Sequence, residues 1–107
     1  MHKERSKVKE IIGEYKQALA WLGVNVEGAL LYGSFAKGKQ RKDSDIDLVV
    51  ISKDFKKMNL RQRLEVLGVA AARIMQPIEA RGYTSEEISL RSPLSFLNEI
   101  LETGIKL

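Results

Sequence analysis

The chain has 107 residues, of which 44% are hydrophobic and 30% charged, and this length and composition predict one soluble domain, residues 1–107, with its own core. No apolar run approaches the ~20 residues of a membrane span, the start Met1–Arg5 lacks a secretory signal's apolar stretch, and without cysteine there is no disulfide framework or thiolate zinc site. These features favour a cytoplasmic protein without membrane contact, and the net charge of +4 fits either an anionic ligand or scattered, solvated lysines.

The first elements are a long helix and a short strand. Apolar residues recur at helical spacing from Arg5 to Leu22, with Lys and Glu on the opposite face. Gly23 stands where a helix C-cap is expected. Residues 28–32 then predict a short buried strand, which ends at a glycine.

The next segment joins this strand to a second one. Gly33-Ser34 is predicted to form a turn that opens a short helix of about one or two turns. A polar, basic loop follows over residues 37–44. Residues 46–52 are β-branched and apolar on both faces, which is typical of a central strand covered on two sides.

The second half of the chain repeats the alternation of helix and strand. A helix is predicted to begin at Met58 or Asn59, and Pro77 to end it before a third strand at 77–83. Its predicted core stripe consists of Leu60, Leu64, Leu67, Ala71 and Ile74.

The last predicted element is a helix that starts at Ser92-Pro93 and stops at Gly104. Its predicted inward-facing residues are Phe96, Leu97, Ile100 and Leu101. The element order predicts an α/β (α+β) fold in which helices flank a small mixed sheet of three to four strands.

Two carboxylates stand at the mouth of the central strand. Residues two apart on a strand point to the same face about 7 Å apart, so Asp45 and Asp47 can share one Mg²⁺ or bracket two ions. Without a cation the two charges would repel each other. The alternative is an Asx-type turn at a strand start, to which Asp43 and Ser44 would also belong.

The Gly33-Ser34 turn strengthens the interpretation as a binding site. Glycine permits a positive φ and close backbone approach, and the N–H groups of a following helix attract phosphate. The Ser34 hydroxyl can donate a further hydrogen bond. A Gly-Ser pair alone is a common turn, but its place before Asp45 and Asp47 indicates a nucleotide site.

With the strand, Gly33-Ser34, a ten-residue gap and Asp45-x-Asp47, the chain resembles the nucleotidyltransferases related to DNA polymerase β, most of all the small "minimal nucleotidyltransferase" (MNT) branch. The resemblance covers about residues 5–101. It implies a polymerase β-like fold in which the aspartates hold Mg²⁺, with two ions expected. It also implies that the Gly-Ser turn holds the β- and γ-phosphates of a nucleoside triphosphate, most commonly ATP.

The family has a third carboxylate on a neighbouring strand, which completes the metal site and can help activate the attacking hydroxyl. The matching position is Glu79, on the third predicted strand, where many relatives have aspartate. The alternative for Glu79 is an edge-strand charge facing water. Arg81 and Tyr83 share its predicted face and are neighbours that could reach substrate.

A basic cluster in the loop, Lys37, Lys39, Arg41 and Lys42, lies beside the proposed triphosphate. It could neutralise phosphate, meet an acidic partner or RNA, or simply be solvated. Lys37 is the best candidate for nucleotide binding because it is closest to Ser34.

The resemblance also suggests a reaction and a partner. It implies transfer of a nucleotidyl group, with AMP from ATP the commonest, to an acceptor hydroxyl. In MNT proteins the acceptor is often a tyrosine of a helical HEPN-type toxin, to which the MNT protein is the antitoxin. The alternative is a catalytically silent module that neutralises its partner by contact, or a nucleotide sensor without transfer. The apolar residues of the first and last helices could serve the core or an interface, for example in a homo-oligomer.

Overall fold

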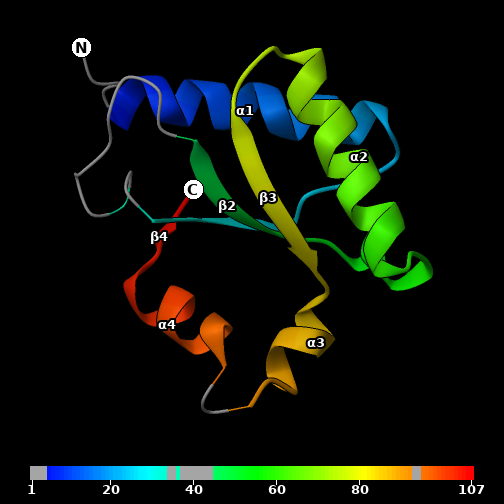
Figure 1. The fold of residues 1–107 in the computed structure, drawn as a ribbon, viewed down its shortest axis with the longest axis vertical. Coiled ribbons are helices and arrows are strands. Elements are labelled where there is room, and N and C mark those ends of the chain that lie inside the picture. Colours follow the sequence, from blue (N-terminus) through cyan, green and yellow to red (C-terminus); the bar gives the residue numbers. More distant parts are fainter. Residues whose placement is uncertain (1–4, 34–35, 37–44, 93–94) are drawn as a thin grey trace.

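A four-stranded mixed sheet forms the centre of the computed structural model, which describes residues 5–33, 36, 45–92 and 95–107 (Figure 1). The strands are β1 (Gly28–Tyr32), β2 (Ile46–Ile51), β3 (Ile78–Tyr83) and β4 (Ile105–Lys106), in the spatial order β3-β2-β1-β4. β1 pairs antiparallel with β2 and β4, whereas β2 pairs parallel with β3. The predicted fold class, a small mixed sheet flanked by helices, is confirmed.

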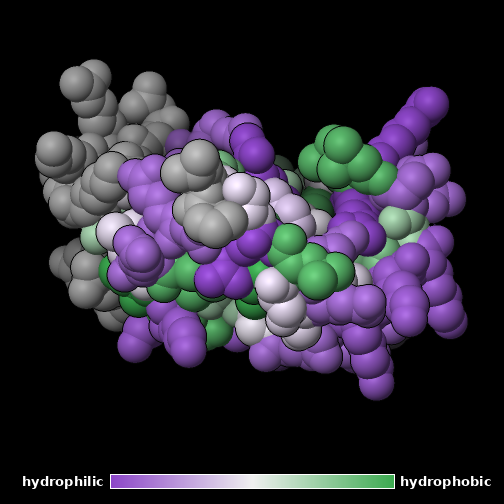
Figure 2. All heavy atoms as spheres, turned by 90° about the horizontal axis from the view of Figure 1, so that it is seen from below, coloured by the Kyte–Doolittle hydropathy of each residue, from purple (hydrophilic) through white to green (hydrophobic). Residues whose placement is uncertain are grey.

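Helices cover both faces of this sheet. α1 (Arg5–Trp21) and α2 (Leu60–Arg73) lie on one face, and the short α3 (Ser85–Ser89) and α4 (Phe96–Thr103) lie on the other side (Figure 1). A 3₁₀ helix, η1 (Lys53–Lys57), follows β2. Seen from the side of α3 and α4, the surface is mostly hydrophilic with separate hydrophobic areas (Figure 2). None of the described helices is both long and apolar enough to cross a membrane.

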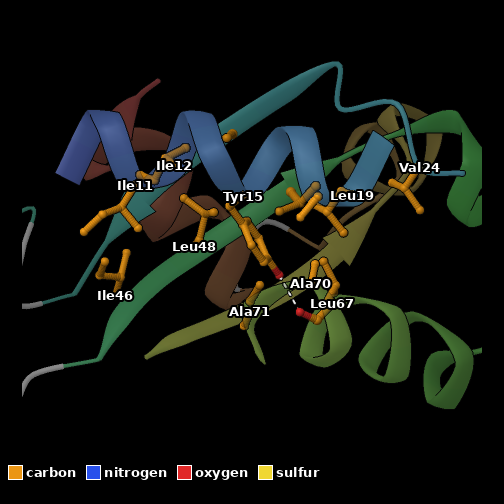
Figure 3. Packing of buried hydrophobic residues seen from close by; sticks show 14 of the residues in the cluster. Ile11, Ile12, Tyr15, Leu19, Val24, Ile46, Leu48, Leu67, Ala70 and Ala71 are labelled. Carbon is orange, nitrogen blue, oxygen red and sulfur yellow. Dashed lines mark hydrogen bonds between the residues drawn. The ribbon is translucent and has the colours of Figure 1, made fainter. Parts of the chain in front are cut away.

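The larger hydrophobic cluster lies between the sheet and α1 and α2 (Figure 3). Ile46 and Leu48 of β2 point into it, because side chains alternate between the two faces of a strand. Tyr15 of α1 is fully buried there, and its hydroxyl donates a 2.8 Å hydrogen bond to the Leu67 carbonyl of α2. Burial without a charged partner raises the pKa of Tyr15 well above its usual range, so the group donates at all ordinary pH values.

A smaller cluster occupies the other face, under α4. It consists of Leu30, Val49, Leu97 and Ile100. Because Val49 and Asp47 are both odd-numbered residues of β2, the side chain of Asp47 belongs to this face. Asp47 therefore lies on the face of the sheet that carries the smaller hydrophobic cluster.

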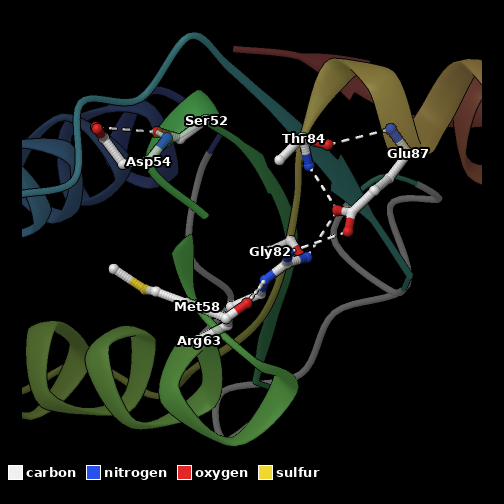
Figure 4. A network of polar contacts seen from close by, with 7 residues as sticks. All are labelled: Ser52, Asp54, Met58, Arg63, Gly82, Thr84 and Glu87. Atoms are coloured by element: carbon white, nitrogen blue, oxygen red, sulfur yellow. Dashed lines mark hydrogen bonds and ion pairs between the residues drawn. The ribbon is translucent and has the colours of Figure 1, made fainter. Parts of the chain in front are cut away.

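Capping explains where two helices begin. The Asn59 side chain accepts from the N–H of Gln62, whose own side chain accepts from the N–H of Asn59, and this capping box starts α2. Thr84 and Glu87 form the same arrangement at α3 (Figure 4). α4 stops at Gly104, as predicted.

Part of the predicted core stripe of α2 is wrong. Leu67 and Ala71 are buried, but Leu60 is 72% exposed and Leu64 50% exposed. The first two turns of α2 run beside the outer edge of β3 rather than over the sheet, so their apolar side chains line a groove. Phe96, predicted to face inward, is 45% exposed.

Other differences concern short elements. The sequence predictions contain neither α3 nor β4, each too short to show a period. α4 begins at Phe96 with Ser95 as its N-cap, later than the predicted start at Ser92, and Pro93 lies outside the described residues. Most of the segment predicted as a short helix after Gly33 and the whole basic loop, residues 37–44, also lie outside them.

Candidate active site

Two of the predicted carboxylates are neighbours across the sheet. Asp47 of β2 is in register with Glu79 of β3 on one side and with Tyr32 of β1 on the other. Residues in register on adjacent strands present their side chains to the same face. Tyr32, Asp47 and Glu79 therefore form a row across three strands, on the face that α4 covers.

The environment of Asp47 favours its neutral form. Its pKa is raised, first by partial burial and then by the negative charges of Glu79 and Asp45, while Arg81 opposes the shift. Two negative charges held on one face repel each other, and a bound cation would offset this repulsion. Carboxylate oxygens are the ligands that hard divalent cations such as Mg²⁺ prefer, so the donor set fits such an ion.

Gly33 is required at the end of β1 for two separate reasons. Its φ of 74° lies in the left-handed region, which residues other than glycine rarely adopt. A Cβ at this position would also overlap the Asp47 carboxylate, whose Cγ would be 3.1 Å away. The turn backbone and the Asp47 side chain are therefore in direct contact.

Asp45 lies just before β2 and is exposed. Its negative charge contributes to the raised pKa of Asp47. Within the described ranges, no three acidic, histidine or cysteine side chains gather closely enough to form a ready-made metal site. The ligand set of Asp45, Asp47 and Glu79 stays a prediction, of which the structure provides the Asp47–Glu79 pairing.

An aromatic and cationic group borders the carboxylates, and the sequence predictions missed part of it. The rings of Tyr32 and Phe96 meet edge to face, 5.6 Å between centroids, and the Arg81 guanidinium lies 4.8 Å from the centre of the Phe96 ring. Burial raises the pKa of Tyr32, and the neighbouring carboxylates Asp47 and Glu79 raise it further, against Arg81. Arg81 shares the face of Glu79, as predicted.

The sequence held a signal for Tyr32 but not for Phe96. Tyr32 directly precedes Gly33, and alternation along the strand places it on the face of the site. Phe96 reaches the site only because α4 folds back under β1, a contact between distant parts of the chain. The remaining candidates, Ser34 and Lys37, lie outside the described residues, as do Lys39, Arg41 and Lys42.

Comparison with known protein families gives a match to nearly the whole chain. A family model described as "Polymerase beta, Nucleotidyltransferase" matches residues 7–107. A search of curated proteins finds no match.

Two solved structures share the fold. One is an inferred nucleotidyltransferase from Sulfolobus solfataricus, with a TM-score of 0.54 and 18% identity over 99% of this chain and 89% of that one. The other is a toxin–antitoxin complex with AMP-PNP, in which the matched chain gives a TM-score of 0.60 and 19% identity over 92% of this chain and 69% of that one. At these identities the likeness concerns the fold alone.

Proposed function

The chain belongs to the polymerase β nucleotidyltransferase family, as its motif predicts, and from this premise we propose that it transfers a nucleotidyl group from a nucleoside triphosphate to an acceptor hydroxyl. One observation carries the proposal: the register that sets Asp47 beside Glu79, with the Gly33 turn directly against Asp47.

Each predicted site residue has a role in this proposal. Asp45, Asp47 and Glu79 would hold Mg²⁺, while Gly33, Ser34 and Lys37 would hold the triphosphate. When bound, the metal would offset the negative charge of the carboxylates and of the phosphates. The raised pKa of Asp47 supports this role because it shows a carboxylate whose charge is poorly compensated by the chain itself.

The proposed reaction forms one bond and breaks another. The acceptor oxygen bonds to the α-phosphorus, and the bond from that phosphorus to the oxygen bridging to the β-phosphate breaks, releasing pyrophosphate. The proton of the acceptor hydroxyl passes to a carboxylate. Glu79 is the candidate, because it is exposed and therefore accessible to an acceptor.

We further propose ATP as the donor and a partner protein, of the helical HEPN type, as the acceptor. The toxin–antitoxin neighbour was solved with AMP-PNP, an adenosine nucleotide, which supports ATP as the donor and a protein as the partner, while the HEPN type rests on the resemblance to MNT proteins. In this proposal the protein acts as an antitoxin that adds AMP to its toxin. The same neighbour also supports the alternative, an antitoxin that neutralises its partner by contact without catalysis.

The test uses ATP labelled at the α-phosphate. Wild-type protein, Asp47→Asn and a control variant, Glu65→Gln, are each incubated with Mg·ATP and the co-expressed partner, and label on the partner is measured. Glu65 is an exposed residue of α2 whose ion pair with Arg61 contributes little. Transfer by wild type and by Glu65→Gln, but not by Asp47→Asn, is expected.

A second readout separates the alternatives. If Asp47→Asn loses transfer and no longer neutralises the partner, neutralisation is catalytic. If it neutralises as well as wild type, the contact mechanism holds instead. Calorimetric titration of Mg·ATP into the protein alone, beside the double variant Asp45→Ala/Asp47→Ala, establishes whether the site binds nucleotide without the partner.

A further inference from the structure

A groove of about 620 Å³ runs along β3 and begins at Glu79. This volume lies within the roughly 300–1,000 Å³ typical of ligand sites. Five consecutive residues of β3, Glu79 to Tyr83, form its floor. Because consecutive strand residues point to opposite faces, a groove that touches all five must follow the edge of the strand and not one face.

The edge of β3 along this groove carries main-chain groups that β2 does not use, of which the Gly82 carbonyl accepts a hydrogen bond from Arg63. β3 is the last strand of the sheet, so it has a partner on one side only. In a parallel pair alternate residues bond to the partner, and the Tyr83 carbonyl accepts from the N–H of Ser52. The odd-numbered residues of β3 thus face β2, and Ala80 and Gly82 direct their main-chain groups outward. Within the described part of the chain, neither N–H of these two residues has a hydrogen-bond acceptor.

The two walls of the groove differ in character. The α2 wall presents Leu60 and Leu64, both largely exposed although they are apolar. The opposite wall presents polar and charged groups, among them Arg81 and Arg91. A segment extended in the groove would meet apolar side chains on one of its faces and charged side chains of both signs on the other.

One part of the groove is lined by an ion pair and another adjoins the candidate active site. Arg63 pairs with Glu87 at 2.7 Å and donates a 3.3 Å hydrogen bond to the Gly82 carbonyl (Figure 4). At the other end of β3, Glu79 is both a groove residue and the strand neighbour of Asp47. An occupant of the groove therefore reaches the carboxylates with its other end.

We propose that this groove binds the acceptor as an extended peptide segment that pairs with the outer edge of β3. Addition of a strand to a free sheet edge takes its affinity from main-chain hydrogen bonds and its specificity from alternate side chains. The segment has apolar residues at alternate positions, against Leu60 and Leu64. Its acceptor hydroxyl is on the other face, where it meets Glu79. This inference rests on the proposed transfer function, because it describes how the acceptor of that transfer binds.

The test titrates two synthetic peptides into full-length, ¹⁵N-labelled protein with Mg·ATP present. The first alternates valine with polar residues and carries a tyrosine at a central polar position. The second has the same composition but a proline within the pairing stretch, which removes a main-chain donor. The first peptide should shift the amide signals of Ala80 and Gly82 in a saturable manner, and the second should bind at least about tenfold more weakly.

Two exposed apolar positions on α2 supply a matched pair of variants. Leu64→Glu places a charge in the apolar wall and should weaken the first peptide about tenfold or more. Val69, 52% exposed, lies outside the groove, so Val69→Glu should change nothing. Equal shifts with both peptides, equal affinity in both variants, or no shift at Ala80 and Gly82 would each overturn the proposal.

A failure of this inference can be distinguished from a failure of the proposed function. Calorimetric binding of Mg·ATP to the wild type is measured on the same sample. If Mg·ATP binds and the edge of β3 does not respond to the peptide, only the acceptor inference fails. If Mg·ATP does not bind, alone or with the peptide, the nucleotide site itself is in question.

Discussion

Asp47 and Glu79 stand opposite each other in the parallel pairing of β2 and β3, two carboxylates on adjacent strands and on one face. Partial burial first, and then the negative charge of Glu79, raise the pKa of Asp47. Because like charges repel, the pairing opposes folding of the metal-free chain. In the proposed site this carboxylate pair would hold a cation, and it lowers the stability of the metal-free chain, a trade-off found at many functional sites.

Glu79→Gln should therefore stabilise the metal-free protein while impairing its function. We expect a rise of about 0.5 kcal/mol in the free energy of unfolding, since the groups are partly solvated, and a loss of Mg·ATP binding. Denaturant unfolding without divalent ions and calorimetry with Mg·ATP measure the two effects. A variant that is less stable than wild type without metal would contradict the repulsion argument.

Gly33→Ala should abolish nucleotide binding, because it disfavours the positive φ and pushes the Asp47 carboxylate out of place. Calorimetry with Mg·ATP measures the loss, and unfolding should show a destabilisation of about 1–3 kcal/mol from the backbone strain. Gly13→Ala serves as the control because a Cβ there meets nothing within 4 Å. Unchanged nucleotide affinity in Gly33→Ala would remove the turn from the site.

Gly82→Ala should destabilise the sheet edge, since a Cβ would stand 2.7 Å from two carbons of the buried Phe55 ring. Overpacking of this kind reduces the free energy of unfolding by about 1–3 kcal/mol. Gly68→Ala, on the exposed side of α2 with open space around it, should instead stabilise the protein by about 0.5–1 kcal/mol. Thermal or urea unfolding of both variants distinguishes crowding from a general effect of glycine replacement.

The Glu87 carboxylate should make stability depend on pH. Its pKa is lowered, first by the hydrogen bond from Arg63 and also by the N–H of Thr84. A carboxylate with a lowered folded pKa stabilises the protein above the unfolded value, about 4.3, and loses this contribution as pH falls through the folded pKa. Because its side chain is 43% exposed, the contribution is screened and about 0.5–1 kcal/mol.

The check is Glu87→Gln followed by urea unfolding across the acidic range. The variant should be less stable than wild type at pH 7, and the difference should shrink as pH falls below about 4. A difference independent of pH would assign the effect to packing at α3. Asp54→Asn, which removes the negative charge that accepts from the Asn25 N–H, provides a comparison outside the groove.

The predictions that rest on local pattern are largely confirmed. The period of α1, the three main strands and the stop at Gly104 follow from spacing and from glycine and proline positions. The Asp47–Glu79 pairing agrees with the motif because each is the second residue of its strand and the two strands are parallel. Membership of the nucleotidyltransferase family is confirmed.

The rest depends on contacts between distant segments, which periodicity does not contain. Leu60 and Leu64 have the spacing of a core stripe, yet α2 extends past the sheet and leaves them on a groove wall. Phe96 follows the helical period too, but its ring meets Tyr32 and Arg81. The roles of Ser34 and Lys37 stay predictions.

The mixed pairing of β2 also fixes when the site can exist during folding. β1 and β2 are joined directly along the chain, whereas β3 must wait for α2 to cross over the sheet before it can pair in parallel. Gly33 and Asp47 can meet in the first step, but Glu79 arrives only in the second. A chain in which β3 is not docked therefore lacks the carboxylate pair, and under the proposed function its nucleotide binding would report whether the sheet is complete.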